Sequence, residues 1–132
     1  MKTSIKVGNA ETIQFVVTEE MQPQFHGVVI HPVCSTWDIA HQFECAARET
    51  LAPHLEEDEQ GIGSHLSIDH TAPAPVGTTV TVSATITELN DNTVVCAVTA
   101  SIGDTICATG KQIQRVLPST TIKNLIQNAA ST

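Results

Sequence analysis

One segment of the chain, residues 35–51, carries the signals of a long helix, and most of the chain beyond it has the pattern of β-strands. Ser35 or Thr36 can cap the start, Asp38 falls in the first turn, and Pro53 stands just past the end. A helix of about 16 residues can cover only one face of a sheet. The sequence therefore predicts an α+β fold in which an antiparallel β-sheet wraps around one long central α-helix.

The β-rich remainder divides into runs bounded by turn sequences. Alternating or β-branched residues predict strands, and Pro, Gly, Asn and Asp predict the breaks between them. The predicted strands after the helix, which we expect to form an antiparallel meander, are residues 62–69, 78–89, 93–102 and 105–117. Before the helix, residues 4–7 and 12–17 resemble short strands, and residues 23–32 a loop. The tail at residues 119–132 either adds a short helical turn or frays.

Length and charge exclude several classes of protein. A chain of 132 residues is expected to form a single domain, residues 1–132. No apolar run approaches the roughly 20 residues of a membrane span, and the first residues lack the apolar core of a secretory signal, so a cytoplasmic location without membrane contact is expected. The net charge of -8, with six Lys and Arg, argues against nucleic-acid binding.

The cysteines and histidines show no metal-binding spacing. There is no C-x-x-C pair and no H-E-x-x-H sequence, so neither a structural nor a catalytic metal is expected. Free, buried thiols are predicted for all four cysteines: Cys34, Cys45, Cys96 and Cys107.

Glu44 is the unusual residue of the predicted helix. At about 100° per residue it falls at the edge of the apolar stripe, between Leu51 and Trp37, and not on the polar back. It could extend into solvent past Leu51 or pair with Arg48 one turn later. Alternatively, because a carboxylate at an apolar boundary is costly, Glu44 belongs to a reactive site.

A resemblance supports the second interpretation. The segments "STWDIAHQFECAA" and "GIGSHLSIDHTAPAPVG" resemble the hotdog-fold thioesterases of the fluoroacetyl-CoA thioesterase-like family. That family has a Thr at the start of the central helix, a Glu eight residues later and a His 26 residues further on. Thr36, Glu44 and His70 match these positions, and Gly63 matches a Gly seven residues before the His. The resemblance covers residues 33–89, and more loosely extends to residue 117.

The resemblance implies an acyl-CoA thioesterase that acts on a small or short acyl group. Glu44 would attack the thioester carbonyl or deprotonate a water that does so, and His70 would be its acid–base partner. Thr36 would supply a hydroxyl that orients Glu44 or the carbonyl. No cofactor is implied, because CoA is part of the substrate.

The same resemblance suggests residues for substrate binding: Val33, Trp37, Gly63 and Gln112. Where family members often carry "G-x-H-x-R" on the last strand, this sequence has "GKQIQRVL", with Gln112 and Gln114 in place of the charged residues. Charge contacts to the acyl group or to CoA would therefore be lost. The cations left for a phosphate contact are Lys111, Arg115 and Arg48.

Other interpretations stay open at the level of sequence. Thr36 could serve only as a helix cap, and His70 could only bond to the following turn. The chain could be a binding module for an acyl-CoA or another small ligand, or a hotdog dehydratase or hydratase. The long strands lack cover in a single copy, so a homodimer or a higher oligomer is expected.

Overall fold

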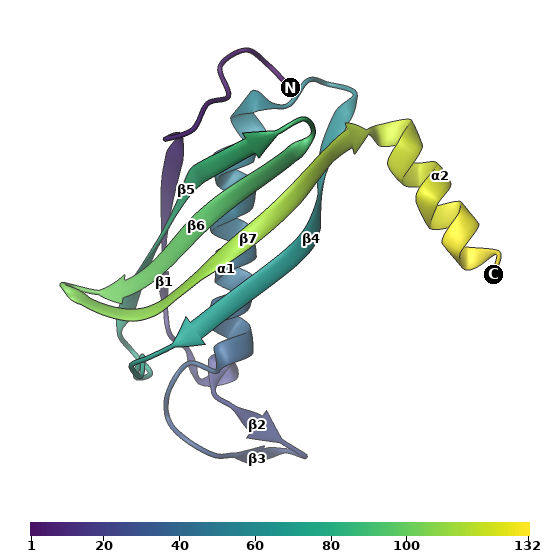
Figure 1. Ribbon diagram of the computed structural model, residues 1–132. Helices are drawn as coiled ribbons and strands as arrows, with labels where there is room; N and C mark the ends of the chain where they lie inside the picture. Colours follow the sequence, from purple (N-terminus) through teal and green to yellow (C-terminus); the bar gives the residue numbers. More distant parts are fainter.

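The computed structural model describes residues 1–132 and is built around one curved five-stranded sheet that wraps one long helix (Figure 1). Helix α1 spans Thr36–Leu51. The sheet has the order β1-β5-β6-β7-β4, and every neighbouring pair is antiparallel. Its strands are β1 (Ala10–Val16), β4 (Glu59–His70), β5 (Thr79–Asn90), β6 (Thr93–Ile102) and β7 (Thr105–Pro118).

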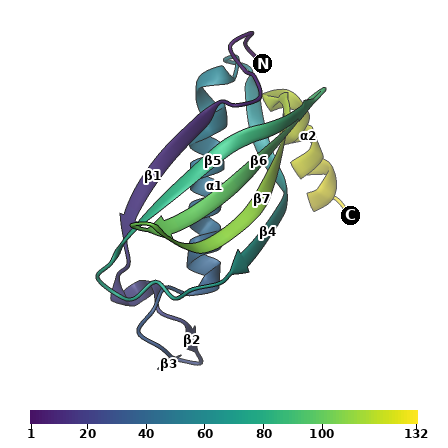
Figure 2. The same ribbon diagram turned by 60° about the vertical axis from the view of Figure 1, so that its left-hand side comes forward.

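The concave face of the sheet holds the core. Figure 2 shows the strands curving around α1. Alternate residues of each strand face the helix, as in Val80, Val82 and Ala84 of β5, which are fully buried. From α1, Ile39 and Phe43 fill the centre of this core. The predicted α+β architecture, with a sheet wrapped around a central helix, is confirmed.

Helix α1 begins at Thr36, as expected from the capping residues of the sequence. Ser35 is the N-cap: its hydroxyl oxygen accepts a hydrogen bond from the Asp38 N–H at 3.2 Å and donates to the Asp38 carboxylate at 2.6 Å. This pairing satisfies a backbone donor that the first turn leaves free. The helix passes into a short 3-10 turn, Ala52–His54, where Pro53 ends the α-helical hydrogen bonding.

Strand order differs from the predicted meander. Only β5, β6 and β7 follow one another in space; β4 pairs with β7, at the far edge from β1. The link from β4 to β5 therefore passes across the end of the sheet. Since β4 has a neighbour on one side only, the backbone groups along its other side have no partner strand.

Three segments differ from the predictions. Residues 4–7 form turns and no strand. The predicted loop before α1 contains a 3-10 turn, Glu19–Met21, and a small hairpin of β2 (Gln24–Phe25) and β3 (Val28–Val29). His26 and Gly27 both have positive φ, which matches the tight turn of such a hairpin. The tail forms a full helix, α2 (Ser119–Ala130), longer than the predicted turn.

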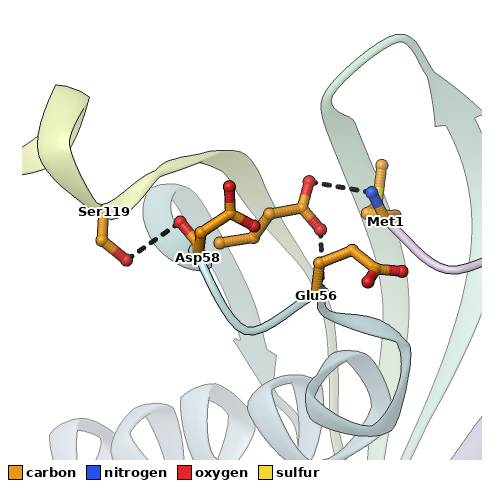
Figure 3. Close-up of polar contacts among 5 residues, drawn as sticks. Met1, Glu56, Asp58 and Ser119 are labelled. Carbon is orange, nitrogen blue, oxygen red and sulfur yellow. Dashed lines mark hydrogen bonds and ion pairs between the residues drawn. The ribbon is translucent and has the colours of Figure 1, made fainter.

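Polar contacts hold the N-terminus and the start of α2 near the start of β4 (Figure 3). The Met1 amine donates to the Glu59 carboxylate at 2.8 Å, and the same carboxylate accepts from the Glu56 N–H at 2.9 Å. These two bonds lower the pKa of Glu59. The Ser119 hydroxyl donates to the Asp58 carbonyl at 3.0 Å, which places the start of α2 beside the same loop.

The cysteines are free, but they are not all buried. Cys34, Cys96 and Cys107 lie in the core, whereas Cys45 is half-buried, 3.7 Å from the His41 ring nitrogen. Burial raises the pKa of Cys34 to about 12, helped by the nearby Asp38 carboxylate, and that of Cys96 to about 11. The prediction of four buried thiols is wrong for Cys45, because its position on α1 faces away from the sheet.

Neither helix combines the length and the apolar character that a bilayer crossing needs.

Candidate active site

Glu44 is half-buried and is held by an amide from the sheet. The Gln112 side-chain nitrogen, Nε2, donates a hydrogen bond to Glu44 Oε2 at 3.2 Å. Gln112 comes from β7 and is only 1% exposed. The chain has a single salt bridge, between Met1 and Glu59, so Glu44 and Arg48 do not form an ion pair. The alternative in which Glu44 pairs with Arg48 is therefore wrong.

Gly63 lies directly beside this pair. A Cβ atom built on Gly63 would stand 3.4 Å from Glu44 Oε2 and 3.6 Å from Gln112 Nε2. The glycine thus leaves space for about one methyl group next to the carboxylate. A side chain larger than that of alanine would fill the space beside Glu44. Gly63 and Gln112, two of the predicted substrate-binding residues, are brought to the carboxylate of Glu44.

Thr36 and His70 form a second pair, at the start of α1 and the end of β4. Thr36 Oγ1 and His70 Nδ1 lie 2.9 Å apart and share a hydrogen bond. The other ring nitrogen, Nε2, is buried and has no partner. Thr36 itself is exposed and Ser35 is the N-cap, so the Thr36 hydroxyl is available to the histidine. A buried ring nitrogen without a partner is costly, and such groups are frequent at functional sites.

A β-bulge brings Gly63 and His70 to the same face of the sheet. They are seven residues apart, and on a regular strand an odd separation places two side chains on opposite faces. The pairing of β4 with β7 shifts by one residue between Gly63 and His65. Gly63 therefore lies opposite Gln114 and His70 opposite Ala108, both of which point toward α1.

The two pairs do not meet within one chain. No hydrogen bond connects Glu44 or Gln112 with Thr36 or His70. Eight residues of helix separate Thr36 from Glu44, a rise of about 12 Å. The structure thus places the three predicted catalytic residues on one side of the sheet, as two separate polar pairs.

A shallow hollow of about 270 Å³, open to solvent, lies next to His70 and is lined by Val33, His70, Thr71, Ala72 and Pro73. Val33, a predicted substrate-binding residue, belongs to this lining. Trp37 does not line it; its ring is half exposed and packs edge-on against Phe25 of β2, with centroids 5.6 Å apart.

The cations proposed for a phosphate contact lie elsewhere. Lys111 and Arg115 alternate with the buried Gln112 and Gln114 along β7, so they project from the convex face, away from α1. Arg48 is exposed on α1. No group of three or more His, Cys, Asp or Glu side chains is arranged to hold a metal ion.

Two glutamines of β7, Gln112 and Gln114, are buried on the core face of the sheet. Gln112 was predicted to contact substrate, yet it is buried against Glu44, and Gln114 donates to the Ala47 carbonyl of α1 at 3.2 Å. The sequence does carry a sign of this burial. In the alternating pattern of "GKQIQRVL", the two glutamines stand at the positions that face the core, where apolar residues are usual.

Comparison with known proteins decides the family. Residues 17–120 match the family described as fluoroacetyl-CoA-specific thioesterase. The chain belongs to this family. The resemblance stated from Thr36, Glu44, Gly63 and His70 is therefore confirmed, and with it the hotdog fold.

Members of the fluoroacetyl-CoA-specific thioesterase family and related structures resemble the chain to different extents. The fluoroacetyl-CoA thioesterase of Streptantibioticus cattleyicolor is 33% identical over 90 residues, which are 64% of this chain and 65% of that protein. A Thermus thermophilus protein described as a thioesterase superfamily member is 30% identical, with a TM-score of 0.92 over 98% of this chain and 96% of its own. A point mutant of a fluoroacetyl-CoA-specific thioesterase, in complex with fluoroacetate and CoA, is 27% identical, with a TM-score of 0.80 over 89% and 99%.

Proposed function

We propose that the protein is a cytoplasmic acyl-CoA thioesterase that hydrolyses a small or short-chain acyl thioester, with CoA as part of the substrate and no further cofactor. The observation that carries this proposal is the Thr36–His70 pair, whose histidine lines the open hollow of about 270 Å³ and keeps one buried ring nitrogen without a partner. The small or short acyl group is chosen because the family is described by its fluoroacetyl-CoA substrate. Family membership and the CoA complex of a relative support the choice of substrate class.

The chemistry needs a group that delivers an oxygen nucleophile and a group that handles the charge on the carbonyl and the leaving thiolate. Glu44 serves the first need, either by direct attack, which leaves an acyl–Glu44 anhydride that water then hydrolyses, or by taking a proton from the water that attacks the carbonyl. His70 serves the second. When the Thr36 hydroxyl donates to Nδ1, the ring proton is on Nε2. From there it can stabilise the carbonyl oxygen or pass to the departing sulfur.

Two chains supply one site in this proposal. Because about 12 Å of helix separates Glu44 from the Thr36–His70 pair, one small thioester cannot contact both within a single chain. The open edge of β4, beside which Glu44 and His70 both lie, can pair with a second copy. A two-fold axis there would bring Glu44 of one chain toward the Thr36–His70 pair of the other.

A dimer is therefore the expected state in solution. Light scattering after gel filtration is expected to give twice the chain mass of 14.0 kDa at micromolar concentration. A larger assembly built from such dimers would agree with the proposal. A monomer at that concentration would contradict it, because half of each site would then be missing.

Substrate class is tested by free-thiol release from a series of acyl-CoAs of increasing length, from acetyl and fluoroacetyl to palmitoyl. We expect turnover of the short thioesters, with kcat/KM falling by about tenfold or more for the long chains, in line with the fluoroacetyl-CoA substrate for which the family is named. Binding of short acyl-CoAs without thiol release would instead identify a binding module. Addition of water to an enoyl-CoA without thiol release would identify a hydratase.

A further inference from the structure

We infer that Gln112 is a positioning residue for Glu44, an inference that rests on the proposed thioesterase function. Its amide holds one carboxylate oxygen, Oε2, and so leaves Oε1 as the oxygen that reacts. The bond from Gln112 Nε2 to Oε2 is 3.2 Å long, and no hydrogen bond engages Oε1.

The burial of Gln112 argues against a role in packing alone. The residue is 1% exposed and stands on the face of β7 that carries the core, between Gly110 and Gln114. Its carbonyl oxygen, Oε1, is buried and accepts no hydrogen bond. Such a group lowers stability relative to an apolar side chain of the same size, since its lost hydration is not replaced. An amide at this position is explained by what its nitrogen does for Glu44.

A neutral amide suits this task. An Arg or a protonated His in the same place would fix the carboxylate but would also offset its negative charge and weaken it as a base or nucleophile. An amide orients the Glu44 carboxylate without adding a positive charge beside it. Gly63 completes the arrangement, because the absence of a side chain keeps one side of the Glu44 carboxylate open.

Gln114 offers a matched control. It lies on the same face of the same strand, it is also buried, and its amide also donates to α1, but to the Ala47 backbone carbonyl and not to Glu44. Replacement of either Gln by Leu removes a buried amide while keeping the side-chain volume similar. Only the change at residue 112 removes a bond to the carboxylate.

The test compares Gln112→Leu with Gln114→Leu in thiol release and in thermal unfolding. We expect Gln112→Leu to lower kcat about ten- to one-hundredfold, the range for loss of a hydrogen bond to a charged group, with KM changed less than about threefold. Its Tm is expected to be unchanged or higher. Gln114→Leu is expected to keep kcat within about threefold. Gln112→Asn, which keeps the amide but shortens its reach, is expected to lower kcat as well.

A double variant separates positioning from a general effect on folding. In a chain that already carries Glu44→Gln, the change Gln112→Leu is expected to cause no further loss, because the two residues act as a unit. A full additional loss would overturn the inference, as would a Gln112→Leu protein with wild-type kcat. If Glu44→Gln itself keeps wild-type turnover, the catalytic role of Glu44 fails first, and that result is distinct from a failure at Gln112.

A readout without turnover completes the test. In NMR spectra of the selectively labelled protein, the side-chain amide signals of Gln112 are expected to move on Glu44→Gln replacement, and those of Gln114 to stay in place. Unmoved Gln112 signals would show that the amide does not bond to the carboxylate, and would overturn the inference whatever the substrate is.

Discussion

Replacement of Glu44 by Gln is expected to lower kcat by at least about two orders of magnitude, a loss of roughly 3 kcal/mol in transition-state stabilisation. The change keeps the side-chain size and removes the charge, and an amide can neither attack the thioester nor accept a proton from water. The Tm is expected to stay the same or to rise slightly, since a half-buried carboxylate becomes neutral.

Glu49→Gln provides the control for this variant, because Glu49 is an exposed carboxylate on the same helix. It is expected to keep normal turnover. If Glu44→Gln retains wild-type kcat, Glu44 does not take part in the reaction, and its place at the edge of the apolar stripe has a structural cause only.

Mixing two inactive proteins is expected to restore activity. His70→Ala removes the partner of Thr36, and we expect a loss of about two to four orders of magnitude, the contribution of a general acid or base. When Glu44→Gln and His70→Ala chains are unfolded together and refolded, about half of the dimers are mixed. Each mixed dimer has one site built from two intact residues, so about one quarter of wild-type activity should return.

Sites confined to single chains would give no such recovery, and this outcome would contradict the shared site while leaving the roles of both residues in place. His65→Ala is a suitable comparison, because His65 is an exposed histidine on the same strand. The His65→Ala protein is expected to be active alone. When it is mixed with Glu44→Gln, the activity of the mixture should equal the fraction of His65→Ala chains in it, with no additional gain.

The sequence predicted those features that depend on neighbouring residues. The start of α1 follows from Ser35 and Asp38, which bond to each other across three residues. The long strands follow from alternation of β-branched and small residues. Thr36 and His70 were recognised from their spacing within a known family, and the structure places them in hydrogen-bonding distance.

Features that depend on distant pairing could not be predicted in this way. The position of β4 beside β7 is set by a register between residues some 50 positions apart, which no local pattern encodes. The bond between Gln112 and Glu44 joins residues 68 positions apart. The helix α2 was underestimated because its apolar side, Leu125 and Ile126, stays exposed and only Ile122 is buried.

Because of the bulge between Gly63 and His65, the geometry of the site depends more on the number of residues in this part of β4 than on which side chains they carry. Loss of one residue here would restore a regular strand, and either Gly63 or His70 would then turn to the convex face, although every residue of the proposed site would still be encoded. Point substitutions at Ser64, which is exposed, do not change which residues of β4 face α1. During divergence, single-codon deletions in this stretch would therefore be eliminated, whereas gaps of two residues could survive.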